Sequence, residues 1–533
     1  MGYNRPNILL ITTDQQRFDT INAAGFSHMK TPNLDRLVKE GCLFQNAYSP
    51  NPVCIPARHN IVSGLSAKHH GFDDNYFDNS IQMPSDLPTF PELLTNSGYG
   101  SIGIGKMHFQ PCRRHNGFDR MLTMEEIPEH LEDDDYALYL HNQGYEHLRS
   151  FHGVRHLLYM LPQQSFLPIE HHGTTWVADR TIEAMKGYTG DRPFLIWSSF
   201  IEPHPPFDVP EEWAHTYDDV EIPEGAVSET PLSSLAEENK HIADYPTKEV
   251  ADRAKRLYYS AISFVDDQIG RILDYLEESG RLNDTLIVFT SDHGEMMGDF
   301  ETYQKFLPYD GSSKIPFVVR YPKLVEPGSV DDRFVDLNDL LPTFLDVAGV
   351  EYPANHKLPG ESIFVEDGFK NRGLQYVEHN KGNKRWVSLR DHHYKYNYYY
   401  GGGCEELFDM IADPQETTNL LHGPVSEEAE SARVSLREKL VRYEKAYGLE
   451  GYVVNDDFVE MEPYVAVPYR ETNFPKHVES LTKEKKEILG AMEDEIQLAI
   501  KNESVVNLEE LDLETFQRFG GFSADQVKAL LKN

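Results

Sequence analysis

The stretch Cys54–Arg58 (CIPAR) places a thiol, a proline and an arginine close together in the chain. It follows a loop rich in Asn and Pro and leads into a short helix that we expect to end at Gly64. A thiol at a helix N-terminus lies beside exposed backbone N–H groups, and an arginine one turn later adds positive charge, so this setting favours a reactive thiolate. So short a motif is also typical of a buried cysteine without a chemical role, and the rest of the chain must decide between these interpretations.

Four apolar runs end directly on residues that could bind or act on a ligand. The runs end on Asp14, Lys106, His204 and the pair Asp292-His293. They are continuous and are separated by helical patterns, which is typical of parallel strands buried on both faces. Because ligands bind beyond the carboxyl ends of such strands, we expect these side chains to converge on one site.

These motifs, taken in order, resemble those of the type I sulfatases of the alkaline phosphatase superfamily. The resemblance rests on six blocks: Asn7–Gln15 (NILLITTDQ), Thr31–Gly41 (TPNLDRLVKEG), Cys54–Gly64 (CIPARHNIVSG), Gly105–Phe109 (GKMHF), Glu202–Phe207 (EPHPPF) and Ser291–Glu295 (SDHGE). It continues in Lys305 and in Leu407–Leu420. The chain departs from the family pattern at Ala57, where Ser or Thr is usual, and at Val62-Ser63, where Leu-Thr is usual.

The resemblance implies that Cys54 is oxidised after synthesis to formylglycine. In that family a maturation enzyme reads the Cys, Pro and Arg of the motif, and all three are present here. The hydrated aldehyde offers one hydroxyl to attack sulfur and a second to expel sulfate, whereas a serine would trap a covalent ester. We therefore expect a formylglycine-generating enzyme among the partners of this chain.

The resemblance also implies a site for one divalent metal. Its expected ligands are Asp14, Gln15, Asp292 and His293, together with the modified side chain of Cys54. Such an ion would hold the nucleophile and polarise a sulfate oxygen. Ca²⁺ is the first expectation, but Gln15 and His293 replace the Asp and Asn of many relatives, and an imidazole ligand leaves Mn²⁺ open.

The remaining motif residues would bind the substrate and move protons. The resemblance assigns Arg58 to the nucleophile and sulfate, and Lys106 and Lys305 to the sulfate oxygens. His108 would orient the hydrated aldehyde or drive the collapse that releases sulfate, and His204 would support protonation of the leaving group and contact the substrate. Asn75, in the GFDDNYF loop, is a candidate substrate contact and equally a turn residue.

Other functions remain open beside hydrolysis of a sulfate monoester. Phosphonate monoester and phosphodiester hydrolases share the formylglycine and the Asp14-Gln15 opening, but they usually carry uncharged residues where this chain has Lys106 and His108. Choline-sulfatase-like enzymes share both Asp-Gln and GKMHF. A pseudoenzyme with an unmodified Cys54 is the most distant alternative.

The elements that must position these residues indicate an α/β fold. Strands are expected at Asn7–Thr13, Tyr99–Gly105, Phe194–Phe200 and Thr285–Thr290, with helices beginning near Pro32 and spanning Lys248–Ser279. We expect a large, mostly parallel sheet sandwiched by helices, as in alkaline phosphatase, in a catalytic domain at 1–370. A smaller α+β subdomain with an antiparallel sheet is expected at 371–455.

An acidic helical extension is expected at 456–533, with helices at Lys483–Lys501 and Leu508–Leu531. We expect it to pack against a second subunit in a homo-oligomer or to close over the pocket. The acidic run 132–135 reads as a solvated surface. Four residues of the C-terminal part could border the pocket: His379, Arg385, Trp386 and Arg390. Adjacent histidines on a strand face opposite sides and are poorly placed to bind one metal ion. We therefore expect loop or pocket-rim positions for the pairs His69-His70, His171-His172 and His392-His393.

Charge and composition limit the partners of the chain. The 533 residues carry 50 Lys+Arg against 87 Asp+Glu, a formal net charge of −37, so phosphate backbones of nucleic acids are repelled. The same negative charge should repel large polyanions more strongly than a small sulfate ester, so we expect the substrate to be a sulfate ester of a small molecule or a carbohydrate. The four cysteines have no metal-finger spacing, and no signal sequence or apolar membrane span is recognisable, so we expect a cytoplasmic protein without a disulfide framework.

Overall fold

The computed structural model describes residues 5–466 except 77–80, 127, 129–130, 146–150, 154–158, 161, 166, 190–191, 241, 244, 246–247, 354–355 and 366–371. The helices expected at 483–501 and 508–531 lie outside the described residues, as does most of the extension expected at 456–533. The division into three parts at 370 and 455 therefore stays a prediction.

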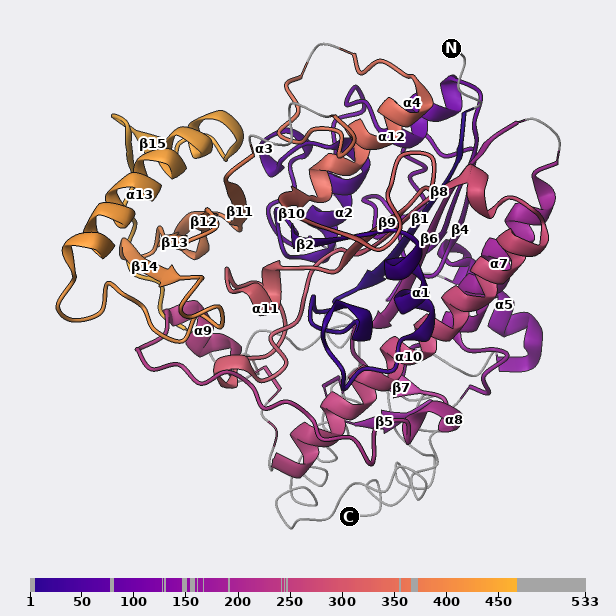
Figure 1. Ribbon diagram of the computed structural model, residues 1–533, viewed down its shortest axis with the longest axis horizontal. Coiled ribbons are helices and arrows are strands. Elements are labelled where there is room, and N and C mark those ends of the chain that lie inside the picture. Colours follow the sequence, from indigo (N-terminus) through magenta and orange to yellow (C-terminus); the bar gives the residue numbers. More distant parts are fainter. Residues whose placement is uncertain are drawn as a thin grey trace, which may run out of the picture.

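An eight-stranded sheet forms the centre of the molecule, in the order β10-β2-β9-β8-β1-β6-β3-β4 (Figure 1). The strand β9 pairs antiparallel with β2 and β8, and the other pairs are parallel. The mostly parallel α/β sheet expected from the sequence is confirmed. The strands span β1 Asn7–Asp14, β2 Cys42–Tyr48, β3 Gly100–Gly105, β4 Arg120–Thr123, β6 Phe194–Pro203, β8 Thr285–Ser291, β9 Phe317–Arg320 and β10 Ser329–Asp336.

Helices cover both faces of this sheet, because its central strands are apolar on both sides. In β1, Ile8 and Leu10 belong to one core, and Leu9 and Ile11 belong to the core on the opposite face. Helices α1 (Pro32–Glu40), α7 (Gly173–Gly187) and α10 (Lys248–Glu278) supply the second core. The first core contains side chains of α2 (Cys54–Ser63), α4 (Phe90–Asn96) and α12 (Leu340–Ala348).

The first turn of helix α1 is capped by a side chain of another helix. The Thr31 side chain makes no capping hydrogen bond. The carboxylate of Asp266, on α10, accepts instead from the backbone N–H groups of Asn33 (3.1 Å) and Leu34 (2.6 Å). The buried carboxylate satisfies donors that the first turn leaves without a partner in the helix and links the two helices on this face.

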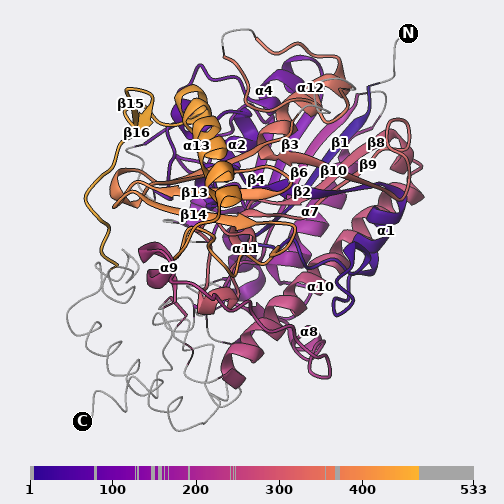
Figure 2. The ribbon, with the colours of Figure 1, turned by 60° about the vertical axis from the view of Figure 1, so that its left-hand side comes forward.

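A four-stranded antiparallel sheet and helix α13 (Glu427–Tyr447) form a smaller unit beside the large sheet (Figures 1 and 2). Its strands are β11 Gln375–His379, β12 Trp386–Arg390, β13 Tyr394–Tyr399 and β14 Cys404–Asp409. Apolar side chains of α13, among them Leu436 and Leu440, pack on this sheet. The smaller antiparallel sheet expected in this part of the chain is confirmed.

Arginines of this small sheet form buried ion pairs. Arg385 pairs with Glu378 (2.7 Å) and with Glu444 of α13 (2.6 Å). Arg390 contacts the Tyr48 hydroxyl and lies 3.4 Å from Asp310, so it bridges toward the large sheet. Both guanidinium groups therefore have buried partners within the protein, and the expectation that these two arginines border the pocket stays a prediction.

Two other surface expectations need correction. Within the acidic run 132–135, Asp134 is buried, caps α5 (Asp135–Leu140) at Ala137 N (2.7 Å), and accepts from the Glu125 backbone N–H (2.5 Å). Burial raises the pKa of Asp134 to about 8. His70 and His172 are likewise buried and do not lie on a rim.

The other described α-helices and strands are short. They are α3 Ala67–His70, β5 Gln163–Gln164, β7 Asp208–Val209, α8 Glu211–Ala214, α9 Ser234–Asn239, α11 Asp310–Ser313, β15 Val453–Val454 and β16 Asp457–Phe458. Among the helices that the structure describes, none combines the length and the apolar character needed to cross a membrane.

Candidate active site

The candidate site lies at the carboxyl ends of four strands that are direct neighbours, in the order β8-β1-β6-β3. Asp14 is the last residue of β1, and Asp292-His293 follow β8. Lys106 follows β3, and His204 follows β6. All four positions are buried, and the convergence expected from the apolar runs is present.

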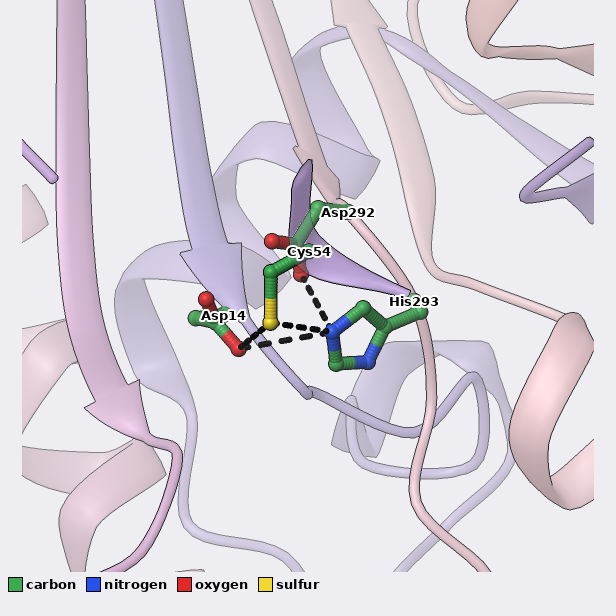
Figure 3. Close-up of side chains that lie close together, drawn as sticks. All are labelled: Asp14, Cys54, Asp292 and His293. Atoms are coloured by element: carbon green, nitrogen blue, oxygen red, sulfur yellow. Dashed lines mark hydrogen bonds and ion pairs between the residues drawn. The ribbon is translucent and has the colours of Figure 1, made fainter. Parts of the chain in front are cut away.

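Cys54 is the first residue of α2, a helix whose ten residues are all buried between the site and the first core. Its Sγ lies 3.2 Å from His293 Nε2, 3.1 Å from Lys305 Nζ and 3.8 Å from Asp14 Oδ1. Figure 3 shows the thiol pointing between Asp14 and His293. Asn75 Oδ1 accepts from the Ile55 backbone N–H (2.9 Å), so this side chain supports the start of α2. Whether Asn75 also contacts a substrate stays a prediction.

The cluster of Asp14, Cys54, Asp292 and His293 fits a divalent cation. One ligand atom from each lies within 4.8 Å of the others, and all four residues are buried. His293 Nδ1 is 3.0 Å from Gly294 O, so Nδ1–H donates to that carbonyl and leaves the Nε2 lone pair facing the carboxylates. His293 Nε2 lies 3.6 Å from both Asp14 Oδ1 and Asp292 Oδ1. Metal-ligating histidines commonly have their second nitrogen fixed in this way.

The two carboxyl groups respond in opposite directions to their surroundings. Burial and the neighbouring Cys54 oppose ionisation of Asp14, but Lys106 and two histidines hold its pKa below the usual range. Burial, together with repulsion from Asp14, raises the pKa of Asp292 to about 6. A divalent cation between two such carboxylates would offset their repulsion.

Gln15 links the metal cluster to the anion-binding lysine. Its backbone N–H donates to Asp292 Oδ1 (3.1 Å), and its side-chain Oε1 accepts from Lys305 Nζ (2.7 Å). Its amide Nε2 contacts Glu295. The residue has a φ of 69°, in the left-handed region. Its place as a metal ligand stays a prediction.

Arg58 is fully buried one turn after Cys54 and faces the carboxylates. Its Nε donates to Asp292 Oδ2 (2.9 Å), and its Nη2 donates to Asp14 Oδ2 (3.2 Å). Its Nη1 donates to Ser199 Oγ (2.8 Å) and to the Lys106 carbonyl. These contacts orient both expected metal ligands, and direct contact of Arg58 with a nucleophile or sulfate stays a prediction.

The two expected sulfate lysines differ in their partners. Lys106 Nζ pairs with Asp14 Oδ2 (2.5 Å) and with Glu126. Lys305 Nζ contacts Gln15 and Cys54, and among the described residues no carboxylate forms an ion pair with it. Burial opposes protonation of Lys305, yet Cys54 and Asp14 raise its pKa above the usual value. Likewise, burial opposes ionisation of the Cys54 thiol, but Lys106 and Lys305 hold its pKa well below the usual value.

The two expected catalytic histidines are buried beside the thiol. One nitrogen of His108 lies within 4.8 Å of both Cys54 Sγ and a Glu126 oxygen. His204 Nδ1 donates to Pro205 O (2.6 Å), which leaves Nε2 facing the Tyr159 hydroxyl (3.5 Å) and Glu126 (3.5 Å). Burial lowers the pKa of both, with Lys106 adding to the effect at His108 and Lys305 at His204.

Three residues of the site were missed in the sequence. Ser199 on β6 accepts from Arg58, and Glu126 pairs with Lys106. Glu125 accepts from the backbone N–H groups of Met107 (3.1 Å) and His108 (2.9 Å). The φ of His108 is 53°, and two N–H groups aimed at one carboxylate stabilise that turn. In the sequence, the consecutive Glu125 and Glu126 are typical of a polar loop, and nothing there indicates that they belong to the site.

The C-terminal sheet contacts two loops of the site, one that carries Lys305 and one that precedes Cys54. Trp386 Nε1 donates to Phe306 O (2.8 Å), next to Lys305, and Asn239 Nδ2 donates to Lys305 O (2.7 Å). His379 is buried and its Nδ1 lies 3.1 Å from Asn51 Oδ1. Trp386 therefore supports the loop that carries Lys305, and among the described residues no contact places it at a pocket rim.

Comparison with known proteins identifies two family models in this chain. The model described as Sulfatase matches residues 6–350. The model described as N-sulphoglucosamine sulphohydrolase, C-terminal, matches residues 298–446.

Individual relatives cover most of the chain. It is 31% identical to an arylsulfatase of Clostridium perfringens (strain 13 / Type A), over 86% of this chain and 98% of that protein. It is 28% identical to a choline-sulfatase of Rhizobium meliloti (strain 1021), over 80% of this chain and 84% of that protein. The solved structure of a phosphonate monoester hydrolase of Agrobacterium radiobacter superimposes with a TM-score of 0.70 at 25% identity, covering 86% of this chain and all of that one.

Proposed function

This chain belongs to the sulfatase family of the alkaline phosphatase superfamily, and on that premise we propose that it hydrolyses a sulfate monoester to an alcohol and inorganic sulfate by means of formylglycine formed from Cys54. One observation carries the proposal. The Cys54 side chain starts a buried helix and lies against both Lys305 Nζ and His293 Nε2. A nucleophile at that point has a cation for the transferred anion on one side and the candidate metal ligands on the other.

In the proposed mechanism, one hydroxyl oxygen of the hydrated aldehyde occupies the position that Cys54 Sγ has in this structure. That oxygen attacks sulfur, the bond from sulfur to the ester oxygen breaks, and the alcohol leaves with a proton. The second hydroxyl then loses its proton, the aldehyde carbonyl re-forms, and sulfate departs. Water finally hydrates the aldehyde again.

The neighbouring side chains have separate proposed roles. Lys106 and Lys305 stabilise the charge that develops on the sulfate oxygens and the leaving oxygen. His108 takes the proton of the second hydroxyl. His204 presents Nε2 to the leaving group, and an anionic ester bound beside it would raise its proton affinity. Arg58 holds Asp14 and Asp292 in place.

A divalent metal fits the set Asp14, Asp292, His293 and the modified Cys54, with Gln15 as a further ligand. When bound, such an ion lowers the pKa of the attacking hydroxyl and polarises a sulfate oxygen. The proposal keeps Ca²⁺ first and Mn²⁺ second, since carboxylates suit both ions and the imidazole favours Mn²⁺. We also retain as proposals a maturation enzyme, a cytoplasmic location and a homo-oligomer formed through the extension at 456–533.

Intact-peptide mass spectrometry and turnover of an aryl sulfate test the proposal together. Protein made with a formylglycine-generating enzyme should contain a Cys54 peptide about 18 Da lighter than the encoded one. It should release sulfate from the ester, and Cys54→Ala should not. Full turnover by Cys54→Ala, or by protein with an unmodified thiol, would contradict the mechanism. An unmodified Cys54 and no turnover in the native host would favour the pseudoenzyme.

A phosphonate monoester hydrolase is the second candidate, favoured by the Agrobacterium structure and by the Asp14-Gln15 pair. The positive Lys106 and the imidazole of His108 support sulfate instead. A comparison of kcat/KM for an aryl sulfate and for the phosphonate monoester with the same aryl group separates the two. A phosphonate preference of several orders of magnitude would reverse the assignment. Choline sulfate belongs in the same screen, given the choline-sulfatase relative.

A further inference from the structure

Glu126 places a carboxylate inside the anion-binding part of the site. Its side chain is only 5% exposed, forms an ion pair with Lys106, and lies 3.5 Å from His204 Nε2. One of its oxygens is within 4.8 Å of Cys54 Sγ and of a His108 nitrogen. A carboxylate at this position repels the anionic ester that the two lysines attract, so its presence needs a physical explanation.

The pairing of charges shows what Glu126 changes. Arg58 is neutralised by Asp14 and Asp292, and Lys106 by Asp14 and Glu126. Among the described residues, Lys305 is the cation of the site that has no carboxylate partner. Three cations thus face three carboxylates, so the positive charge offered to an anion comes from Lys305 and from a bound divalent metal, and Glu126 lowers it by one unit.

Two other roles for Glu126 fit these contacts less well. As a metal ligand with Cys54 and His108, it would offer a cation one carboxylate, whereas the cluster of Asp14, Asp292 and His293 around the same Cys54 offers two. As a surface acid it would be solvated, but its side chain is almost wholly buried.

We infer that Glu126 is a specificity-determining residue, which makes the site select singly charged tetrahedral anions over doubly charged ones. A sulfate monoester carries one negative charge, whereas a phosphate monoester above its second pKa and the product inorganic sulfate each carry two. The additional charge faces the Glu126 carboxylate at short range, where like charges repel strongly. The same repulsion aids release of the sulfate product. This inference rests on the proposed function, since it takes the site to be one for a sulfate ester.

Calorimetric titration of the matured, metal-loaded full chain tests this directly. The probes are inorganic sulfate and methanesulfonate, which share a tetrahedral sulfur and differ by one charge. In Glu126→Gln, the affinity for sulfate relative to methanesulfonate should rise by roughly 10- to 100-fold over the wild type. An unchanged ratio would overturn the inference, whether or not the protein turns over a sulfate ester.

Two variants separate charge from structure. Glu126→Asp keeps the charge and should keep the wild-type ratio, and a shift as large as that of Glu126→Gln would show that shape is responsible. Glu132→Gln removes one exposed acid from the following segment and should change neither affinity.

A kinetic measurement adds independent evidence: kcat/KM for 4-nitrophenyl phosphate relative to 4-nitrophenyl sulfate at pH 8 should rise by the same order in Glu126→Gln. Lack of sulfate turnover by the wild type would contradict the proposed function and leave the binding ratio as the test of Glu126.

Discussion

Cys54 Sγ and Lys305 Nζ lie 3.1 Å apart, although 251 residues separate them in the chain. The thiol begins α2 beneath one face of the large sheet, and the lysine comes from the loop after β8. Among the described residues Lys305 has no carboxylate partner, so its full charge acts on whatever binds at Cys54. This pair makes Lys305 the strongest candidate for stabilising an anion at the nucleophile.

Replacement of this lysine should therefore affect the chemical step. In Lys305→Ala, kcat/KM for an aryl sulfate should fall about 100- to 1000-fold, because one preorganised donor to the developing charge is lost. Steady-state kinetics measures the effect, and Lys248→Ala, an exposed lysine on α10, is the control that should keep wild-type values. Unchanged kcat/KM in Lys305→Ala would remove this residue from the anion-binding set.

Metal affinity should depend on pH through Asp292. Its pKa of about 6 in the metal-free protein is above the ordinary value because of burial and Asp14. Below that pH the carboxyl holds a proton that a metal ion must displace. Apparent Mn²⁺ affinity should therefore rise with pH, by about tenfold per unit below 6 for one displaced proton, and level off above it.

The slope should be steeper where His293 is also protonated. Burial opposes its protonation, but Asp292 raises its pKa above the usual value. Competition with a chelator of known pH dependence, at several pH values, measures the affinity. In Asp292→Asn the affinity should be lower and its dependence on pH shallower. The same affinity for wild-type protein at pH 5 and pH 7 would contradict this arrangement of ligands.

Glu125 should act on catalysis through His108. Glu125→Ala leaves the Met107 and His108 N–H groups without their acceptor, so the free energy of unfolding should fall by about 1–3 kcal/mol. Activity should fall as well, because the left-handed turn at His108 is no longer held. Urea unfolding and kinetics measure the two effects.

A double-mutant cycle identifies the route of the Glu125 effect. In a His108→Ala background, Glu125→Ala should lower activity little further while it still lowers stability. Equal losses of activity with and without His108 would show that Glu125 acts by another route. Glu132→Gln is again the matched acidic control.

The strands of the large sheet could be predicted because a continuous apolar run is a local signal, whereas the roles of the site residues come from the family resemblance and stay predictions. Continuous apolar runs predicted β1, β3, β6 and β8, and parallel pairing brings their carboxyl ends together. The antiparallel β9 was not predicted, since nothing in its four residues distinguishes direction.

Long-range contacts account for what the sequence did not predict. The carboxylate of Asp266 caps α1 by accepting a hydrogen bond from the Leu34 N–H, and the two residues are 232 positions apart in the chain. Asp134, Glu125 and Glu126 belong to acidic stretches that resemble surface loops, and only the path of the chain after β4 buries them. In the same way, the carboxylates that pair with Arg385 and Arg390 include Glu444 and Asp310, which lie 59 and 80 residues away in the chain.

Trp386 offers a test of whether the small sheet supports the active site. Its indole Nε1 donates to Phe306 O (2.8 Å), directly after Lys305, and Phe306 has a φ of 80°. Trp386→Phe keeps an aromatic ring in the buried position but removes the donor. We expect kcat/KM to fall about tenfold or less, and stability to fall by about 1–3 kcal/mol for the unsatisfied carbonyl. Trp386→Ala, which also leaves a cavity, should cost about 3–5 kcal/mol. If the loop positions Lys305, the activity loss of Trp386→Phe should disappear in a Lys305→Ala background while the loss of stability remains. Additive activity losses would show that the small sheet contributes only to folding.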